Sequence, residues 1–155
     1  MFAGGLSNIY LNNLLKPRTT LYAGTFSCNN IVKPRTAKYV FIANLSPVGA
    51  VGTHFVCVAI DGEHAFYYDP LGLPCYNKHI LEYMSENCVK VRFYLRAIQT
   101  LDSIFCGYHC AAYVFAFENN VNVSTFLSMY TPKPSKRNDQ ISVSFVINEI
   151  NKLSI

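Results

Sequence analysis

The chain has 155 residues, the usual size of one domain, which argues against a multidomain assembly and against a very small fold held together by cross-links. Hydrophobic residues make up 51% of it and charged residues only 14%, so it has ample material for a packed core and is not a disordered chain. A net charge of +4 permits an anionic partner without requiring one. We therefore expect a single domain over residues 1–155.

No apolar stretch approaches the roughly 20 residues that span a bilayer, and the N-terminal residues lack a basic region followed by an apolar block. We expect a soluble, monomeric protein that has no membrane partner and is not secreted. The cysteines have neither CxxC spacing nor a secretory context, which favours free thiols. They are Cys28, Cys57, Cys75, Cys88, Cys106 and Cys110.

The first third of the chain predicts one short helix and one buried strand. Ser7 can cap a helix that Pro17 ends. Residues 24–34 are typical of a loop. Residues 38–45 are β-rich and apolar on both faces, as in a central strand.

Two β-rich runs on either side of Asp61 and Gly62 predict a hairpin, because this dipeptide is strongly favoured in two-residue turns. If Asp61 and Gly62 are the two central turn residues, His54 lies directly opposite Asp69. Opposed residues share a face, with Cβ atoms about 4.5–5.5 Å apart. The pattern therefore predicts a hydrogen-bonded couple of His54 and Asp69.

The rest of the chain is richer in helix. We expect a helix over residues 77–86, a half-buried strand over residues 89–97, a polar loop over residues 99–105 and a buried helix over residues 106–117. The expected strand turns an apolar face to the core and a basic face to solvent: Val89, Val91, Phe93 and Leu95 on the first, and Lys90, Arg92, Tyr94 and Arg96 on the second. Two later helices can be capped by Ser124 and Asn138. Strands followed by helices predict an α+β domain.

Cys106 lies where the polar loop enters the buried helix. A helix N-terminus stabilises a thiolate, and Gly107 would allow a substrate backbone to approach closely. A nucleophilic cysteine also needs a base, a group that orients the base, and donors for the oxyanion. Taken alone, a cysteine at the head of an apolar helix is more often a packing residue. A zinc site is disfavoured, because His109 and Cys110 lack a second ligand pair.

Four sequence elements follow one another in the order His, acid, Gln, Cys: GTHF around His54, DPLG from Asp69, Gln99, and FCG around Cys106. This arrangement resembles the adenovirus-type (adenain-like) cysteine proteases and, more distantly, the proteases of ubiquitin-like proteins. The resemblance covers residues 22–117. It implies a papain-like cysteine protease fold in the adenain/ubiquitin-like protease variant, with a central mixed sheet flanked by helices.

Residue by residue, the resemblance implies that Cys106 is the nucleophile, His54 its general base and Asp69 the orienting acid. Gln99 would donate to the oxyanion beside the Cys106 backbone N–H. Phe55 replaces the Trp that commonly follows this His, the acid is Asp rather than the Glu of many adenoviral enzymes, and the chain after Cys106 is short. These departures concern substrate contacts more than the chemistry.

The implied activity is that of a cysteine endopeptidase that needs no metal or other cofactor. Its substrates would be viral or virus-derived precursors such as capsid proteins, cleaved after Gly-Gly or another small-residue pair, in the virion or in the host nucleus or cytoplasm. One alternative is a deconjugating protease for a ubiquitin-like protein, whose Gly-Gly tail would fit the same cleft. Another is an inactive DNA-binding or structural relative.

The resemblance also suggests an activating peptide and DNA as cofactors. Cys88 would form a disulfide with the peptide, and Lys90, Arg92 and Arg96, on one face of the expected strand, would contact DNA. The alternative is an ordinary thiol beside a solvated basic face. A Gly-Gly pair ending at Gly5 further suggests self-processing.

Overall fold

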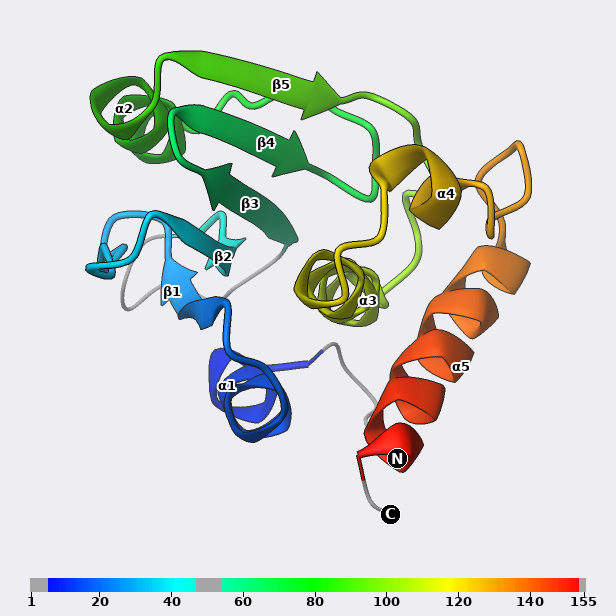
Figure 1. Ribbon diagram of the computed structural model, residues 1–155. Helices are drawn as coiled ribbons and strands as arrows, with labels where there is room; N and C mark the ends of the chain where they lie inside the picture. Colours follow the sequence, from blue (N-terminus) through cyan, green and yellow to red (C-terminus); the bar gives the residue numbers. More distant parts are fainter. Residues whose placement is uncertain (1–5, 47–53, 154–155) are drawn as a thin grey trace.

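The computed structural model describes residues 6–46 and 54–153, and Figure 1 shows their arrangement. The elements in chain order are α1 (Asn8–Leu15), the 3-10 helix η1 (Lys16–Arg18), β1 (Tyr22–Ser27), β2 (Lys38–Asn44), β3 (Phe55–Asp61), β4 (His64–Tyr68), α2 (Lys78–Asn87), β5 (Lys90–Tyr94), α3 (Cys106–Glu118), α4 (Val123–Leu127) and α5 (Lys136–Lys152).

The strands form one mixed sheet in the order β1-β2-β3-β4-β5. The outer pairs β1–β2 and β4–β5 are parallel, and the two inner pairs are antiparallel. Helix α3 packs on one face together with α1, α4 and α5, while α2 covers the other face (Figure 1). The expected α+β domain with a central mixed sheet and flanking helices is confirmed.

Strand β3 is the centre of the sheet and is buried on both faces. Successive strand residues point to opposite faces. Accordingly Phe55 and Cys57 belong to the core under α3, whereas Val56 and Val58 belong to the core under α2. Packing between two hydrophobic layers fixes the position of β3, and His54 immediately precedes this strand.

Helix α3 is the most deeply buried helix, since ten of its thirteen residues are buried. Its sequence is apolar nearly all round, as expected for a helix enclosed by a sheet and by other helices. Cys106 is its first residue, so the fold holds that side chain at the end of a rigid element.

Three local expectations were wrong. The expected loop over residues 24–34 begins with strand β1, which pairs in parallel with β2 despite its Gly and Ser content. Helix α4 is capped by Asn122 rather than by Ser124. Helix α5 is capped by Ser135, and Asn138 is buried inside its first turn.

Strand β5 differs from the half-buried strand expected over residues 89–97. It is shorter, and Val89, Phe93 and Leu95 are exposed although they were expected to face the core. The reason is that β5 is an edge strand, on which α2 covers only the region of Val91. Tyr94, expected on the solvent side, instead packs against the core under α3.

Within residues 6–46 and 54–153, no helix combines the length and apolar character needed to cross a membrane.

Candidate active site

The β3–β4 hairpin has a different register from the one we expected. Asp61 pairs with His64, so the central turn residues are Gly62 and Glu63 rather than Asp61 and Gly62. Gly62 has φ +62°, and the first central position of a type II′ hairpin turn favours glycine. The predicted register, with His54 directly opposite Asp69, is therefore wrong.

The His54 and Asp69 side chains nevertheless meet. His54 Nε2 lies 2.7 Å from Asp69 Oδ1, and the side chains are only 14% and 3% exposed. The register moved by one residue on each strand, which turns a direct pair into a diagonal pair on the same face. Diagonal neighbours remain within reach of longer side chains.

The turn after β4 holds Asp69 in place and connects it to Gln99. Asp69 Oδ1 also accepts a hydrogen bond from Leu71 N at 2.8 Å, and Pro70 O accepts from Gln99 N at 3.0 Å. Gly72 has φ +70°, and a Cβ there would come within 2.5 Å of Ala97 N. The glycine thus allows the acidic turn to pack directly on the segment that leads into Gln99.

Cys106 completes a series of three interacting side chains. His54 Nε2 lies 2.7 Å from Asp69 Oδ1, and the Cys106 side chain interacts with the His54 imidazole. Because Nε2 is occupied by the carboxylate, Nδ1 is the nitrogen available to the sulfur. Burial alone would lower the pKa of His54, but its hydrogen bonds to Asp69 and Cys106 outweigh burial and raise that pKa from 6.5 to about 9. The site therefore favours a protonated imidazole.

Gln99 is buried beside the loop that enters α3. Its Nε2 donates to Ser103 O at 3.0 Å and to Ser103 Oγ at 3.2 Å, whereas its Oε1 is buried without a hydrogen-bond partner among the described residues. Phe105 N donates to the same Ser103 Oγ at 3.2 Å, so the Gln99 amide nitrogen and the backbone before Cys106 lie around one oxygen atom. Its role as an oxyanion donor stays a prediction.

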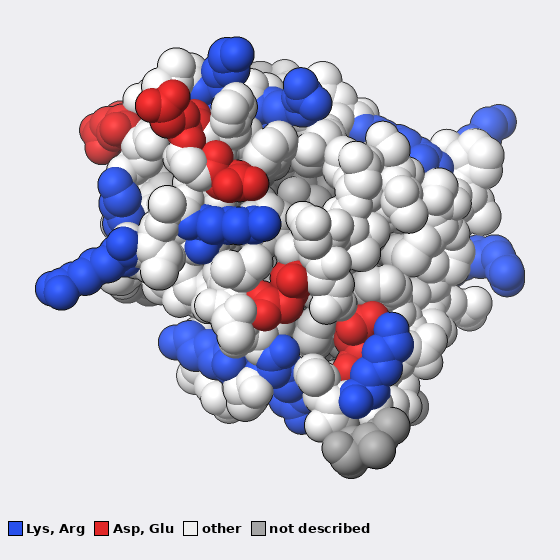
Figure 2. Space-filling view, viewed as in Figure 1, with Lys and Arg blue, Asp and Glu red and all other residues white. Residues whose placement is uncertain are grey.

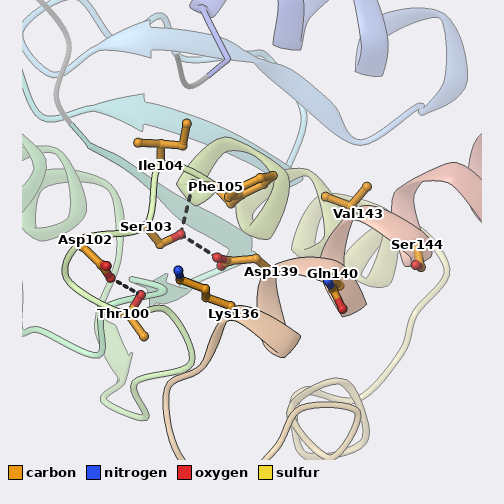
Figure 3. A pocket seen from close by; sticks show the side chains of 10 residues that line it. All are labelled: Thr100, Asp102, Ser103, Ile104, Phe105, Lys136, Asp139, Gln140, Val143 and Ser144. Carbon is orange, nitrogen blue, oxygen red and sulfur yellow. Dashed lines mark hydrogen bonds between the residues drawn. The ribbon is translucent and has the colours of Figure 1, made fainter. Parts of the chain in front are cut away.

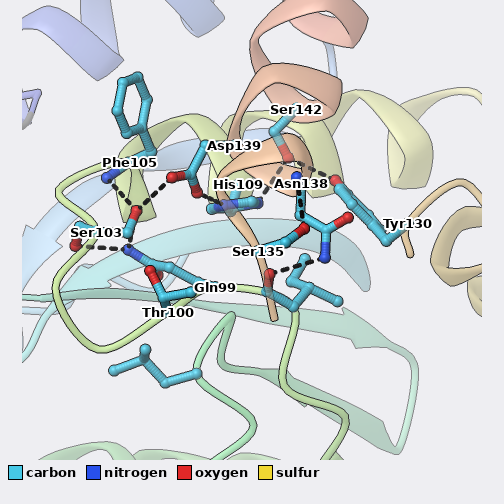
Figure 4. Close-up of polar contacts among 12 residues, drawn as sticks. Gln99, Thr100, Ser103, Phe105, His109, Tyr130, Ser135, Asn138, Asp139 and Ser142 are labelled. Carbon is cyan, nitrogen blue, oxygen red and sulfur yellow. Dashed lines mark hydrogen bonds and ion pairs between the residues drawn. The ribbon is translucent and has the colours of Figure 1, made fainter. Parts of the chain in front are cut away.

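Two site residues that the sequence analysis missed are His109 and Asp139. His109 is fully buried, and its Nε2 lies 2.8 Å from Asp139 Oδ1. Asp139 Oδ2 accepts a hydrogen bond from Ser103 Oγ at 2.9 Å (Figure 4). A histidine in an otherwise apolar buried helix was a usable signal, because buried polar groups require partners.

A cavity of about 700 Å³ opens beside this network, between the 99–105 loop and the start of α5 (Figure 3). Its mixed polar and apolar lining consists of Thr100, Asp102, Ser103, Ile104, Phe105, Lys136, Asp139, Gln140, Val143 and Ser144. Phe105 directly precedes Cys106, but Cys106 itself is not among the residues that line this cavity. Among the described residues, no three His, Cys, Asp or Glu side chains are grouped so that they could hold a metal ion.

The residues predicted to bind activators lie on or near the β5 edge. Cys88 is half-buried at the end of α2, and burial raises the pKa of its thiol. Lys90 and Arg92 are exposed. On the face shown in Figure 2, Lys and Arg are interspersed with Asp and Glu rather than gathered in one patch. The peptide and DNA contacts stay predictions.

Arg96 does not lie on an open basic face as expected. Its guanidinium donates to Leu127 O at 2.8 Å, to Thr131 O at 3.1 Å and to Tyr130 O at 3.3 Å. These carbonyls lie at and beyond the end of α4, and Leu127 O also accepts from Tyr130 N at 3.2 Å. Arg96 thus joins the segment after β5 to the end of α4.

We expect Arg96→Ala to lower the free energy of unfolding by about 1.5–3 kcal/mol, because charged hydrogen bonds to carbonyls are lost. Urea denaturation measures this change. Arg92→Ala is the matched control and should change stability by no more than about 0.5 kcal/mol, since Arg92 is exposed. Equal effects of the two substitutions would contradict the structural role of Arg96.

The suggested self-processing site at Gly5 lies outside the described residues. Leu6 is described, is 5% exposed and packs over Gly107, where an added Cβ would come within 3.0 Å of Leu6 Cβ. The space that we expected Gly107 to leave for a substrate backbone is thus taken up at least in part by Leu6.

No family model and no curated protein sequence matches this chain. The fold is similar to that in the crystal structure of the ASFV pS273R protease, with a TM-score of 0.58 and 15% sequence identity over 90% of this chain. A selenomethionine structure of the same protease matches 73% of this chain and 45% of its own, with a TM-score of 0.49 and 17% identity. In the first comparison this chain spans 66% of the length of the viral protease. At such low identity, the first comparison shows that the two proteins share a fold.

Proposed function

We propose that this chain is a cysteine endopeptidase in which Cys106 is the nucleophile, His54 the general base and Asp69 the orienting acid. The observation that carries the proposal is that His54 Nε2 lies 2.7 Å from Asp69 Oδ1 while the Cys106 side chain is close enough to His54 to raise the imidazole pKa. These residues come from the start of β3, the end of β4 and the start of α3. Packing alone does not require an acid, an imidazole and a thiol to meet there.

The arrangement can support acyl transfer. The Cys106 thiolate attacks the peptide carbonyl carbon, and the resulting oxyanion is stabilised by Gln99 and by the Cys106 backbone N–H. Protonated His54 then gives its proton to the leaving amine. Water activated by neutral His54 hydrolyses the thioester and restores the thiol. Asp69 holds the imidazole so that Nδ1 faces the sulfur throughout.

We further propose the adenain/ubiquitin-like protease variant of the papain-like fold, and viral or virus-derived precursor proteins as substrates. The fold shared with the ASFV pS273R protease supports both proposals. The order His54, Asp69, Gln99, Cys106 along the chain supports the variant. Cleavage after Gly-Gly follows from the resemblance and requires a direct test.

A propargyl probe that ends in Gly-Gly tests this proposal when it is offered both as a short peptide and as a full-length ubiquitin-like protein. Mass spectrometry of the digested protein shows which cysteine carries the adduct. A Cys106 adduct with the short peptide supports an endopeptidase, whereas an adduct with the full-length probe alone indicates a deconjugating protease. Absence of a Cys106 adduct with both probes contradicts the proposal. Cys88→Ser serves as the cysteine control and should still be labelled.

We expect Gln99→Ala to lower kcat by about 10²–10³-fold with little change in KM, because an oxyanion donor acts mainly when charge develops. Steady-state hydrolysis of a short Gly-Gly peptide measures both constants. Gln140→Ala is a matched control because Gln140 is exposed on α5, and its kcat should remain that of the wild type. An effect of Gln99→Ala on KM alone would assign Gln99 to substrate binding instead.

A further inference from the structure

A continuous series of hydrogen bonds runs from α5 through α3 to the 99–105 loop (Figure 4). Tyr130 Oη lies 2.6 Å from Ser142 Oγ, which lies 2.6 Å from His109 Nδ1. His109 Nε2 lies 2.8 Å from Asp139 Oδ1. His109 and Ser142 are 0% exposed and Asp139 is 5% exposed, so the series is shielded from water.

The hydrogen-bond directions follow from the chemistry of the groups. A carboxylate only accepts, so His109 Nε2 and Ser103 Oγ each donate to Asp139. Since the Ser103 hydroxyl hydrogen points at Asp139, the remaining lone pairs of Ser103 Oγ must accept. They do so from Gln99 Nε2 and from Phe105 N, both at 3.2 Å.

The unpartnered atom of Gln99 fits the same account. Its Oε1 is buried without a hydrogen-bond partner among the described residues. Buried acceptors are normally satisfied. A Ser103 hydroxyl with a free hydrogen could donate to Oε1 if the amide turned over. Because Asp139 takes that hydrogen, the amide keeps its nitrogen toward Ser103.

Helix α5 also holds the other end of the loop. Asn138 Nδ2 donates to Ile98 O at 3.0 Å, while the next residue, Asp139, binds Ser103. Asn138 and Asp139, two successive residues of α5, therefore form hydrogen bonds at both ends of the segment that carries Gln99. Ser103 in turn holds Phe105 N, the amide before Cys106.

We propose that Asp139, supported by His109, is a positioning residue that orients the Gln99 amide and places the backbone N–H of Cys106 for oxyanion stabilisation. In this orientation one Gln99 N–H is shared by Ser103 O and Ser103 Oγ, and the second N–H is left to donate to the oxyanion. The inference rests on the proposed cysteine protease function and adds a second buried His–Asp pair to it. This pair acts through Ser103 and does not touch the sulfur-activating couple of His54 and Asp69.

The test compares Asp139→Asn and Ser103→Ala with the wild type. An Asn side chain can offer its NH₂ to Ser103, which frees the Ser103 hydroxyl to donate to Gln99 Oε1. Removing the Ser103 hydroxyl breaks the same connection while leaving the His109–Asp139 pair intact. We expect each variant to lower kcat for a short Gly-Gly peptide by about 10²-fold, with KM changed by less than about 3-fold.

A second readout separates positioning from general damage. In alkylation by iodoacetamide, the Cys106 sulfur forms an S–C bond as iodide leaves, and no carbonyl oxyanion has to be stabilised. Alkylation of Cys106 should therefore stay within about 3-fold of the wild-type rate in both variants. A merely structural role would instead lower the folded fraction and reduce turnover and alkylation together.

Matched controls use the same changes at residues outside the network. Asp61→Asn and Ser144→Ala alter exposed residues outside the 99–105 loop and should keep the wild-type kcat. Ser103→Thr retains the hydroxyl and should restore most of the turnover lost in Ser103→Ala.

The outcomes distinguish the two proposals. An active wild type whose kcat is unchanged in Ser103→Ala overturns the inference alone, as does a parallel loss of turnover and alkylation in that variant. A wild type that neither hydrolyses Gly-Gly peptides nor forms a Cys106 adduct with either probe overturns the proposed function together with the inference. If Asp139→Asn fails to fold, Ser103→Ala and its Thr rescue still decide the question.

Discussion

Replacing Cys106 with Ala should abolish peptide hydrolysis and leave the fold intact. The loss should be at least about 10⁴-fold, because the proposed mechanism forms the acyl-enzyme on the Cys106 sulfur. The substitution removes one sulfur atom from a side chain at the first residue of α3, so little packing is lost. Turnover and the thermal unfolding temperature together check both parts of this expectation.

Cys110→Ala is the matched control for this prediction. Cys110 lies one turn further along α3 and is fully buried, so its replacement costs more packing. The Cys110 variant should therefore be the less stable of the two and still hydrolyse substrate. Wild-type turnover in Cys106→Ala would remove Cys106 as the nucleophile.

Replacing Asp69 with Asn should lower kcat by about 10²–10⁴-fold, because the imidazolium loses its stabilising negative charge and the amide can also present its NH₂ to the ring and disfavour the productive tautomer. The pH profile should change as well. In the wild type the pKa of His54 is about 9, so activity should decline as pH rises through that value and the proton for the leaving amine is lost. Without the carboxylate, burial lowers the His54 pKa and the decline should begin at a lower pH.

The same pKa shift predicts how stability depends on pH. The folded-state pKa of His54 is raised above the unfolded value of 6.5, so its contribution is fully present below pH 6.5 and is lost as pH rises through about 9. Urea unfolding at pH 6 and at pH 10 should show a larger wild-type loss than in Asp69→Asn. Asp61→Asn, at the exposed hairpin end, provides the control, and an identical pH response of wild type and Asp69→Asn would contradict the coupling.

The sequence was most informative where the signals are local. Two β-rich runs and the turn dipeptide predicted the hairpin, and a register error of one residue on each strand kept His54 and Asp69 on the same face. Strand β1 was missed because it depends on parallel pairing with β2 rather than on its own composition. Two strands joined by a long connection have no turn signal between them, such as the dipeptide that predicted the β3–β4 hairpin.

The residues that surround Gln99 were harder to predict for the same reason. His109 and Asp139 are 30 positions apart, and no motif connects them. The alternation around Arg96 predicted that its basic side chain faces solvent. In the structure the Arg96 guanidinium instead donates to carbonyls near the end of α4. In both cases the partner comes from a helix whose position depends on the packing of the whole domain.

The long sequence separation between Gln99 and its α5 partners has a consequence for the order of biosynthesis. His54, Asp69 and Cys106 all leave the ribosome before Asp139, and domains are synthesised from the N-terminus onward. A nascent chain can therefore bring the thiol and imidazole together before α5 has docked, while the 99–105 loop is still unfastened. Thiol reactivity should accordingly appear earlier than peptide-bond cleavage during synthesis, at nascent-chain lengths that include Cys106 but not yet α5.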